Sequence, residues 1–573
     1  MAVQENPNLF ALIDMGSNGI RFSISDLCPL TSRILPTVFQ DRAAISLFDA
    51  QFFPGNTERQ PISVSVQESV FRHLVRFKQT CKDFGVLENN IAFLATEATR
   101  TAINSAEFLS AIQDCTGWNV SLLSKEEEGE LGAMGIASSL ASVKGLVMDL
   151  GGGSTQITWM IASGGSVRTS PSGPISFPYG AAAVTKRFEE AEGDQKIPVI
   201  QKLQIEMIRN FERAFHELDI PDELWDHAKT HGGFELFLSG GGFRGWGYLL
   251  LSQSKVNPYP VPIINGFRAD CSDFSNTTNI ASLASLKGST VFGISKRRAS
   301  QVPAVACLVN SLVTAIPHIK SIHFCQGGVR EGYLFRKLPA EVRAKDPLVV
   351  ATTPYSTTSS GKLSLLLKNA LPGGSLEDEG TCIPSSFTGY LLQAFTNFMF
   401  VHSSVSKESR AAVALHSTTS GVLAATHGIS HVDRTLLALL LYYRWQGDLC
   451  PPDESFLHRL QQIISAEEAW WCQYIGRVAA FVGEIYPSGI ITEATPRVSF
   501  STGWSPGKKG RPIVSLSIKV PDQQNPPCND ADWLTDEVSR ITKVGKKKNW
   551  AIMERAGERW GLKVDILILQ HEQ

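Results

Sequence analysis

Two short segments of this chain repeat one pattern of apolar and polar positions. In ALIDMGSNGIRFSIS (11–25) and GLVMDLGGGSTQITW (145–159), an apolar run ends in one aspartate, a glycine-rich turn follows, and a second apolar-alternating run leaves the turn. Alternation with a period of two residues is typical of strands. The sequence therefore predicts the same strand, tight loop and strand twice, with Asp14 and Asp149 at matching places.

Strands and helices alternate after the first of these hairpins. Apolar residues at helical spacing predict a helix that carries Val70, Leu74, Phe77 and Cys81 on one stripe. The next predicted elements are a strand and loop (90–100), a helix (104–116), a strand (119–124) and a helix that begins at Lys125. Such alternation predicts an α/β domain. The strand and helix pattern restarts near Gly145, where a second α/β domain is expected to begin. It continues through a predicted helix (200–218) and a predicted strand (321–335).

The C-terminal part has a different composition. Turn-forming clusters between 351 and 388 predict a linker, and the pattern from 387 to 482 is mostly helical. Two alternating runs, VSLSIKV (514–520) and VDILIL near the end, predict a small α/β cap. The expected domains are 1–140, 141–340, 341–482 and 483–573.

Composition limits the class of protein. A chain of 573 residues is too long for one core, and 43% hydrophobic with 19% charged residues suits globular domains. The net charge of −2 gives no overall attraction to nucleic acid or to an anionic membrane, so neither direct DNA binding nor membrane binding is expected. Ten scattered cysteines without a CxxC pair, and a first segment without a signal-peptide pattern, predict a cytoplasmic protein. The apolar run 435–443 is too short to span a bilayer.

The paired hairpins carry the candidate chemistry. Asp14 and Asp149 are candidate ligands for Mg²⁺, because hard cations prefer oxygen ligands. The turns offer N–H and O–H donors to phosphate oxygens. The candidate phosphate-binding residues are Gly16, Ser17, Asn18, Gly151, Gly152, Gly153, Ser154 and Thr155. For a single hairpin, an aspartate that merely caps a turn is the better explanation, whereas two copies favour a phosphate clamp.

A second candidate is SKEEEGEL (124–131). Ser124 followed by Glu127 forms a capping-box pattern, which favours a structural role at a helix N-terminus. The alternative is that a glutamate of this segment acts as general base on a water that attacks a phosphoryl group. On the residues alone the cap is the better interpretation.

Other motifs carry weaker signals. The segment GGGFRG (240–245) fits G-x-G-x-x-G, but no acidic residue follows at the spacing that dinucleotide binding needs, so a glycine turn is expected. Arg21 and Arg100 follow predicted strands and are candidates for gripping phosphate, whereas the run Lys296–Arg298 is expected to be a solvated face. Four residues, His416, His427, His431 and Asp433, suggest an HD-type metal site, but surface histidines are the better explanation.

Seven segments occur in the order seen in one family. They are IDMGSNGIRFSI, ATEATR, SKEEEGEL, MDLGGGSTQ, SFPYGAAAVTKRF, FGISKRRASQVPA and GGVREGYLF. Over about the first 340 residues the chain thus resembles the exopolyphosphatase/guanosine pentaphosphate phosphohydrolase family of the actin-like ATPase superfamily. The resemblance implies two ribonuclease H-like domains around a phosphate cleft, then a mostly helical HD-like domain and a small α/β domain. It implies ATP, guanosine polyphosphate or polyphosphate as ligands with Mg²⁺, and it implies that Glu127 is the catalytic glutamate.

One position departs from the family pattern. Active members typically have GGGSTE in the second loop, where this chain has Gln156. An amide supplies neither negative charge nor a base, so we expect phosphate binding with weak or absent hydrolysis. The first segment and the divergent C-terminal half resemble a fungal regulatory branch whose members relay mitochondrial state to nuclear transcription. This implies signalling partner proteins; the oligomeric state is not fixed, and a homodimer is compatible with the sequence. The alternative is an active Mg²⁺-dependent phosphohydrolase.

Overall fold

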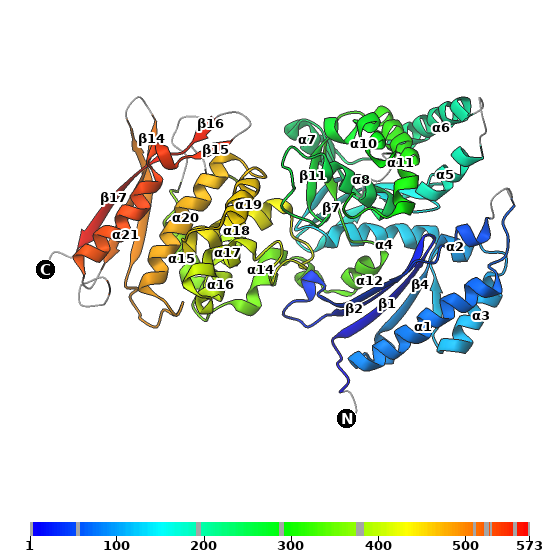
Figure 1. Cartoon of the computed structure of the whole chain (residues 1–573), viewed down its shortest axis with the longest axis horizontal. Helices are drawn as coiled ribbons and strands as arrows, with labels where there is room; N and C mark the ends of the chain where they lie inside the picture. Colours follow the sequence, from blue (N-terminus) through cyan, green and yellow to red (C-terminus); the bar gives the residue numbers. More distant parts are fainter. Residues whose placement is uncertain are drawn as a thin grey trace. The chain divides into compact units, whose positions relative to one another are not determined.

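The computed structural model describes residues 4–52, 58–190, 196–285, 291–373, 383–507, 511–520, 527, 530–553 and 558–570. Residue contacts divide the chain into two compact units. Unit 1 comprises 1–254, 263–347 and 427–429, and unit 2 comprises 255–262, 348–426 and 430–573. Each unit is described by itself below (Figure 1).

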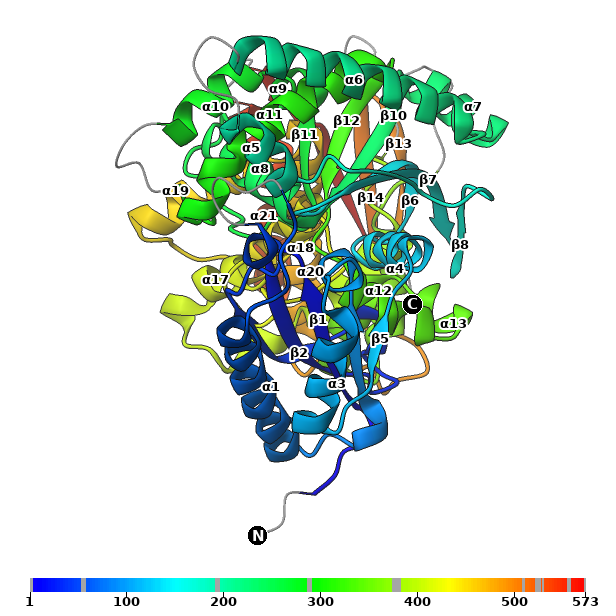
Figure 2. The same ribbon diagram turned by 90° about the vertical axis from the view of Figure 1, so that its right-hand side faces the viewer.

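The first α/β domain of unit 1 is built on a sheet of order β3-β2-β1-β4-β5. The strands are β1 (Leu9–Gly16), β2 (Gly19–Asp26), β3 (Thr37–Ala43), β4 (Ile91–Ala95) and β5 (Val120–Leu122). Strands β1 to β3 are antiparallel, whereas β4 and β5 run parallel to β1. Helices α1 (Val64–Phe84) and α3 (Ser105–Thr116) cover one face (Figures 1 and 2). The predicted stripe Val70, Leu74, Phe77 and Cys81 is buried there, as expected.

The second sheet of unit 1 repeats this order. Its path is β8-β7-β6-β10-β12, with β11 on the β12 edge and β9 paired to β7. The strands are β6 (Val143–Leu150), β7 (Thr155–Ser163), β8 (Ser166–Thr169), β9 (Ile175–Phe177), β10 (Phe234–Ser239), β11 (Phe267–Asp270) and β12 (Ile319–Phe324). Strands β6, β7 and β8 are antiparallel, and β10 and β12 run parallel to β6. The restart of the pattern near Gly145 is therefore confirmed as a second α/β domain with the strand order of the first.

The second domain also contains helices between its strands. In the described part of the chain they are α5 (Ala181–Glu189), α6 (Lys196–Glu217), α7 (Asp222–His231), α8 (Gly240–Ser252), α9 (Cys271–Phe274), α10 (Thr277–Ser285) and α11 (Lys296–Ala315). Two sequence interpretations are wrong here. The GGGFRG segment is the first turns of α8 rather than a glycine turn. The segment 321–335 is a strand only to Phe324, after which α12 (Val329–Lys337) forms.

Helices α4 (Lys125–Ser138) and α12 lie between the two sheets (Figure 1). One apolar cluster contains Leu12 of β1, Leu131 of α4, Val147 of β6 and Leu334 of α12, so both sheets share this core. Glycines let the backbone of α4 approach the start of α12 closely. A Cβ on Gly135 would lie 2.7 Å from the Gly328 nitrogen and closer still to its carbonyl oxygen.

Unit 2 is mainly helical, as predicted for 387–482. Its helices are α14 (Pro347–Thr352), α15 (Ser360–Asn369), α16 (Gly389–Phe398), α17 (Lys407–His416), α18 (His431–Trp445), α19 (Pro451–Gln461), α20 (Ala466–Ile485) and α21 (Ala531–Val544). Helix α15 lies inside the segment that was expected to be a linker, so that prediction is wrong for Ser360–Asn369. The buried Trp470, Trp471 and Tyr474 of α20 pack against one another in the core.

The predicted α/β end of the chain forms a small sheet of order β13-β14-β17. The strands are β13 (Ser499–Pro506), β14 (Pro512–Val520) and β17 (Lys563–Gln570), and β15 (Ala551–Met553) pairs with β16 (Glu558–Trp560). Helix α21 contacts β17 and α20. In the described part of the chain, no helix has both the length and the apolar composition of a membrane span.

Candidate functional site

Both predicted hairpins form, and each aspartate lies near the end of the central strand of its sheet. Asp14 of β1 faces Arg21 of β2, and Asp149 of β6 faces Gln156 of β7. Burial raises the pKa of both carboxyl groups, and the Arg21 guanidinium counteracts the rise at each. Asp14 also raises the pKa of Asp149. The two carboxylates therefore lie within electrostatic range of each other.

A serine that the sequence analysis missed holds the second aspartate. Ser239, the last residue of β10, lies beside Asp149 in the parallel pairing of β10 with β6, and its hydroxyl donates to Asp149 Oδ2. On the first aspartate, Arg21 Nη1 lies 3.9 Å from Asp14 Oδ2. The signal for Ser239 was present in the sequence, because a strand that ends in serine precedes the three glycines of 240–242.

The glycine loop 151–155 is oriented by helix α5. The carbonyl of Gly152 accepts from the N–H groups of Ala182 and Ala183, at 2.9 and 3.1 Å, and the carbonyl of Gly153 accepts from Gly180. In a trans peptide the N–H points opposite to the C=O. The N–H groups that follow these carbonyls, those of Gly153 and Ser154, therefore point away from α5. Side chains of the first domain also reach this loop, because a Cβ on Gly153 would overlap the Glu97 carboxylate.

The other predicted residues of this loop lie beside those amides. The Gly151 carbonyl accepts from Ala181, so the Gly152 N–H also points away from α5. The Thr155 hydroxyl donates to the Asp149 carbonyl at 2.8 Å, and the Ser154 carbonyl accepts from the Gly151 N–H at 3.0 Å. These contacts close a tight turn directly after Asp149.

The loop between β1 and β2 faces this turn. A Cβ on Gly152 would overlap the Asn18 side-chain amide, so the two loops touch. The Ser17 carbonyl accepts from the Phe48 N–H at 3.0 Å, which turns the following N–H, that of Asn18, to the opposite side. Gly16 and Gly19 pair at the end of the hairpin. The candidate phosphate residues of both hairpins are thus brought together.

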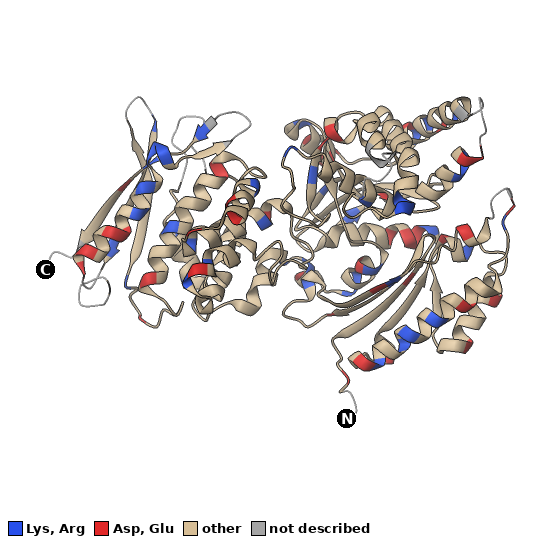
Figure 3. Cartoon of the chain, viewed as in Figure 1, with Lys and Arg blue, Asp and Glu red and all other residues tan. Residues whose placement is uncertain are grey.

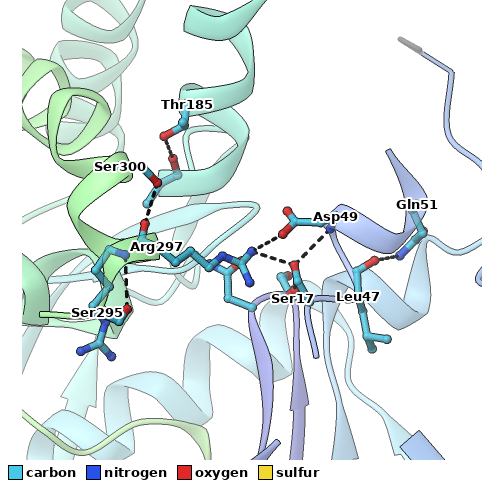
Figure 4. Close-up of polar contacts among 12 residues, drawn as sticks. Ser17, Leu47, Asp49, Gln51, Thr185, Ser295, Arg297 and Ser300 are labelled. Carbon is cyan, nitrogen blue, oxygen red and sulfur yellow. Dashed lines mark hydrogen bonds and ion pairs between the residues drawn. The ribbon is translucent and has the colours of Figure 1, made fainter. Parts of the chain in front are cut away.

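An arginine of the second domain reaches the first loop. Arg297, near the start of α11, donates to Asn18 Oδ1 at 2.6 Å and to Ser46 Oγ at 2.7 Å. Its guanidinium also pairs with Asp49 at 2.9 Å, as Figure 4 shows. The interpretation of Lys296–Arg298 as a solvated face is therefore wrong for Arg297. Ser295 caps α11, and this cap fixes where the helix begins.

The two glutamates at the start of α4 have different surroundings. Glu127 is exposed, and its Oε2 accepts from the Ser124 N–H at 2.8 Å while the Ser124 hydroxyl accepts from the Glu127 N–H. The capping box is therefore confirmed. Glu128 is turned inward, and burial raises its pKa to about 7. Figure 3 shows the acidic first turn of α4, to which both residues belong.

Glu128 lies among the other charges of the site. Arg100, at the end of α2 (Glu97–Arg100), places Nη1 3.5 Å from Glu128 Oε2 and also donates to the Leu123 carbonyl. Arg100 lowers the pKa of Glu128, whereas Glu97, Asp149 and Asp14 raise it. The structure therefore places Glu128, and not the predicted Glu127, beside Arg100 and within electrostatic range of the aspartates. Sequence reasoning missed it because both residues fit the same motif.

The histidine segment does not form a metal site in the part of the chain that the structure describes. No three His, Cys, Asp or Glu side chains there are arranged to hold a metal ion. His416 bonds Asp453 at 2.9 Å, and Asp433 closes a capping box with Ser430. His431 is 2% exposed, so the interpretation of these histidines as surface residues is wrong for His431.

Known proteins resemble the chain in both of its parts. A model of the Ppx/GppA phosphatase family matches residues 30–341, and a model of the RTG2 C-terminal domain matches residues 346–571. The chain is 39% identical over 499 residues to Retrograde regulation protein 2 of Saccharomyces cerevisiae. That alignment covers 85% of this chain and 82% of that protein.

Bacterial relatives match shorter parts. A guanosine-5'-triphosphate,3'-diphosphate pyrophosphatase of Vibrio atlanticus is 29% identical over 158 residues, which are 27% of this chain and 30% of that protein. The Aquifex aeolicus member of the Ppx/GppA family, known from a crystal structure, is 21% identical to this chain in sequence. The two structures match with a TM-score of 0.45, and the match covers 57% of this chain and 97% of that chain. Because the family model spans more than half of the sequence and the S. cerevisiae relative matches along most of its length, the chain belongs to the Ppx/GppA phosphatase family.

Proposed function

We propose that unit 1 binds the phosphate groups of a nucleotide or polyphosphate between its two sheets and acts as a regulator with weak or absent hydrolysis. The amides of the two hairpin turns, with Arg21 and Arg100, hold the phosphate oxygens. The observation that carries the proposal is Gln156, which is 8% exposed and lies directly opposite Asp149. An amide in that buried place gives the site a hydrogen-bonding group where a hydrolase would have a third carboxylate.

Mg²⁺ fits Asp14 and Asp149 as its protein ligands. Magnesium is usually bound by one or two carboxylates together with phosphate oxygens and water. The two aspartates offer two carboxylates: Asp14 is buried, Asp149 is partly buried, and Asp14 raises the pKa of Asp149. A bound cation would supply the positive charge that these carboxylates and the phosphates share.

The regulatory role is supported by the match to Retrograde regulation protein 2 along most of the chain. We assign the chain to signalling from mitochondria to the nucleus, in the cytoplasm, through partner proteins. Closure of the two sheets on a ligand would change the surface offered to those partners, as hinge motions do in other two-domain proteins. The HD-like character of the helical domain and the fold of the C-terminal domain stay predictions.

The second candidate is an active phosphohydrolase. A specific observation favours it: Glu128 has a pKa of about 7, near the value at which a general base works best at neutral pH. Arg100 and Glu128 would then position and deprotonate a water for attack on the terminal phosphoryl group. The bond from that phosphorus to the bridging oxygen breaks, and orthophosphate leaves.

One experiment separates these candidates. The purified chain is incubated with Mg²⁺ and ATP, guanosine pentaphosphate or polyphosphate, and released phosphate is measured together with the melting temperature. A ligand that binds only the native state must raise the melting temperature. A thermal shift without turnover supports the regulator. Turnover that disappears in Glu128→Gln but persists in the capping variant Glu127→Gln supports the hydrolase.

The Gln156→Glu variant tests the proposal from the other side. Restoring the carboxylate is expected to raise any residual phosphate release by at least tenfold, because it adds negative charge at the metal side of the site. Binding measured without turnover should change much less. An unchanged or lower rate in this variant would contradict the role given to Gln156.

A further inference from the structure

Strand β17 lies at an open edge of the small sheet of unit 2. The sheet order is β13-β14-β17, and β17 pairs with β14 alone among the described strands. Figure 1 shows β17 on the outer side of β14. In a strand that is paired on one side only, alternate residues keep their backbone N–H and C=O groups without a partner. This edge can therefore accept a further strand.

The other edge strands of the described sheets are shorter or protected. β5, β9, β15 and β16 have three residues, and β8 and β11 have four. β3 carries the adjacent charges Asp41 and Arg42, and β13, the opposite edge of the small sheet, ends in Pro506. Shortness, charges and proline are features by which proteins protect sheet edges. β17 has eight residues, and Ile566–Leu569 in its second half carries no charge.

Two leucines on β17 are exposed on one face of the sheet. Leu567 is 58% exposed and Leu569 is 42% exposed. The alternate residues point to the other face, where Val564 is buried and Ile566 and Ile568 are half-buried. Side chains directly opposite each other on paired strands contact each other, so a second strand at this edge would cover apolar surface that now faces water.

A second copy of β17 fits this edge. Antiparallel pairing about a two-fold axis at Ile568 places Leu567 of each copy opposite Leu569 of the other. Lys563 and Asp565, which pair with each other at 2.9 Å, then lie outside the paired segment. Such a contact uses the same surface on both copies, which is the commonest arrangement in homo-oligomers.

Helix α21 is compatible with the same two-fold axis. It contacts β17, and its exposed charges are separated along its length. Asp532 and Asp536 lie in the first half, whereas Arg540 and Lys543 lie in the second, as Figure 3 shows for the two ends of the helix. An axis that reverses the strand also reverses the helix, so the acidic half of one α21 lies on the side of the basic half of the other. The charge pattern is therefore complementary to itself.

We propose that the open edge of β17 is a self-association surface, on which a second copy of this chain adds its own β17 in antiparallel orientation. The two small sheets then join into one, and the leucines of both copies form an apolar cluster on one face. This association involves unit 2 alone and needs no ligand on unit 1.

Analytical ultracentrifugation of the full chain, without nucleotide, tests the association. A species of twice the chain mass is expected to increase with protein concentration. Leu567→Lys places a charge on the open edge, as natural edge strands do, and should weaken the dimer about tenfold or more because two cross-strand leucine pairs are lost. Leu567 is exposed, so the variant should keep its fold, which circular dichroism checks.

Two further variants make the test specific. Leu122→Lys is the matched control, because Leu122 is also an exposed leucine on an edge strand, β5, and it should leave the dimer unchanged. The double variant Leu567→Lys/Leu569→Glu tests the register. The proposed axis brings the two new charges of opposite sign together, so the double variant should dimerise more tightly than Leu567→Lys alone.

Each result decides one part of the proposal. A chain that stays monomeric at every concentration overturns it and leaves the edge open to a strand of another protein. A dimer that folded Leu567→Lys does not weaken overturns the location. A double variant that dimerises no better than Leu567→Lys overturns the antiparallel register about Ile568.

Discussion

Replacing Glu128 by glutamine should make the chain more stable at alkaline pH. Burial raises the pKa of Glu128 from 4.5 to about 7, against the opposing effect of Arg100. In the unfolded chain the same carboxyl group ionises near its ordinary value. Between these two values the unfolded state loses its proton first, so ionisation stabilises the unfolded state and the free energy of unfolding falls as the pH rises.

The size of the effect follows from the two pKa values. A rise from 4.5 to about 7 corresponds to about 3 kcal/mol of lost stability above pH 7. At pH 5 the loss is only about 1 kcal/mol, because the pH is only half a unit above the pKa of the unfolded chain, while the group is still protonated in the folded state. Glutamine carries no charge and fills a similar volume, so Glu128→Gln removes this dependence. The stability difference between variant and wild type should therefore grow by about 2 kcal/mol from pH 5 to pH 8.

The measurement is urea unfolding followed by circular dichroism at both pH values. Asp14 and Asp149 also titrate in both proteins, and they interact with Glu128, so the difference between the two proteins reports the ionisation of Glu128 together with its coupling to these aspartates. Glu127→Gln is the matched control, since glutamine also closes a capping box, and its effect should be small and equal at both pH values. A constant difference between Glu128→Gln and wild type from pH 5 to pH 8 would refute the assignment of Glu128 as the buried carboxylate of the site.

Two further predictions concern the contacts between the domains of unit 1. Gly135→Ala should destabilise the chain by about 1–3 kcal/mol, because the new Cβ would overlap the backbone of Gly328. The matched variant Gly132→Ala should stabilise α4 by up to about 1 kcal/mol, because its Cβ would meet nothing within 4 Å. Equal melting temperatures of the two variants would contradict this prediction. Arg297→Ala should cost less than about 1 kcal/mol, because its ion pair is partly exposed, yet it should speed amide hydrogen exchange around Asn18. Unchanged exchange there would show that Arg297 does not hold the loop.

Local pattern was enough for the elements that carry the site. The two hairpins, the helix stripe from Val70 to Cys81 and the capping box at Ser124 all formed as expected, because each depends on the spacing of residues close together in the chain. The same local reasoning failed at GGGFRG. Glycine usually marks a turn, but here packing against the β6 strand end decides, and a helix begins at Gly240.

The sequence by itself determined that two aspartate hairpins exist, that a glutamate-rich helix ends the first domain, and that Gln156 stands where the family has glutamate. Only the tertiary structure decided which side chains meet. Successive helix residues point about 100° apart, so the cap holds Glu127 outward while Glu128 turns toward Arg100. Likewise, Arg297 reaches Asn18 from 279 positions away. Such pairings depend on how the two sheets close around α4 and α12, which residue spacing along the chain does not record.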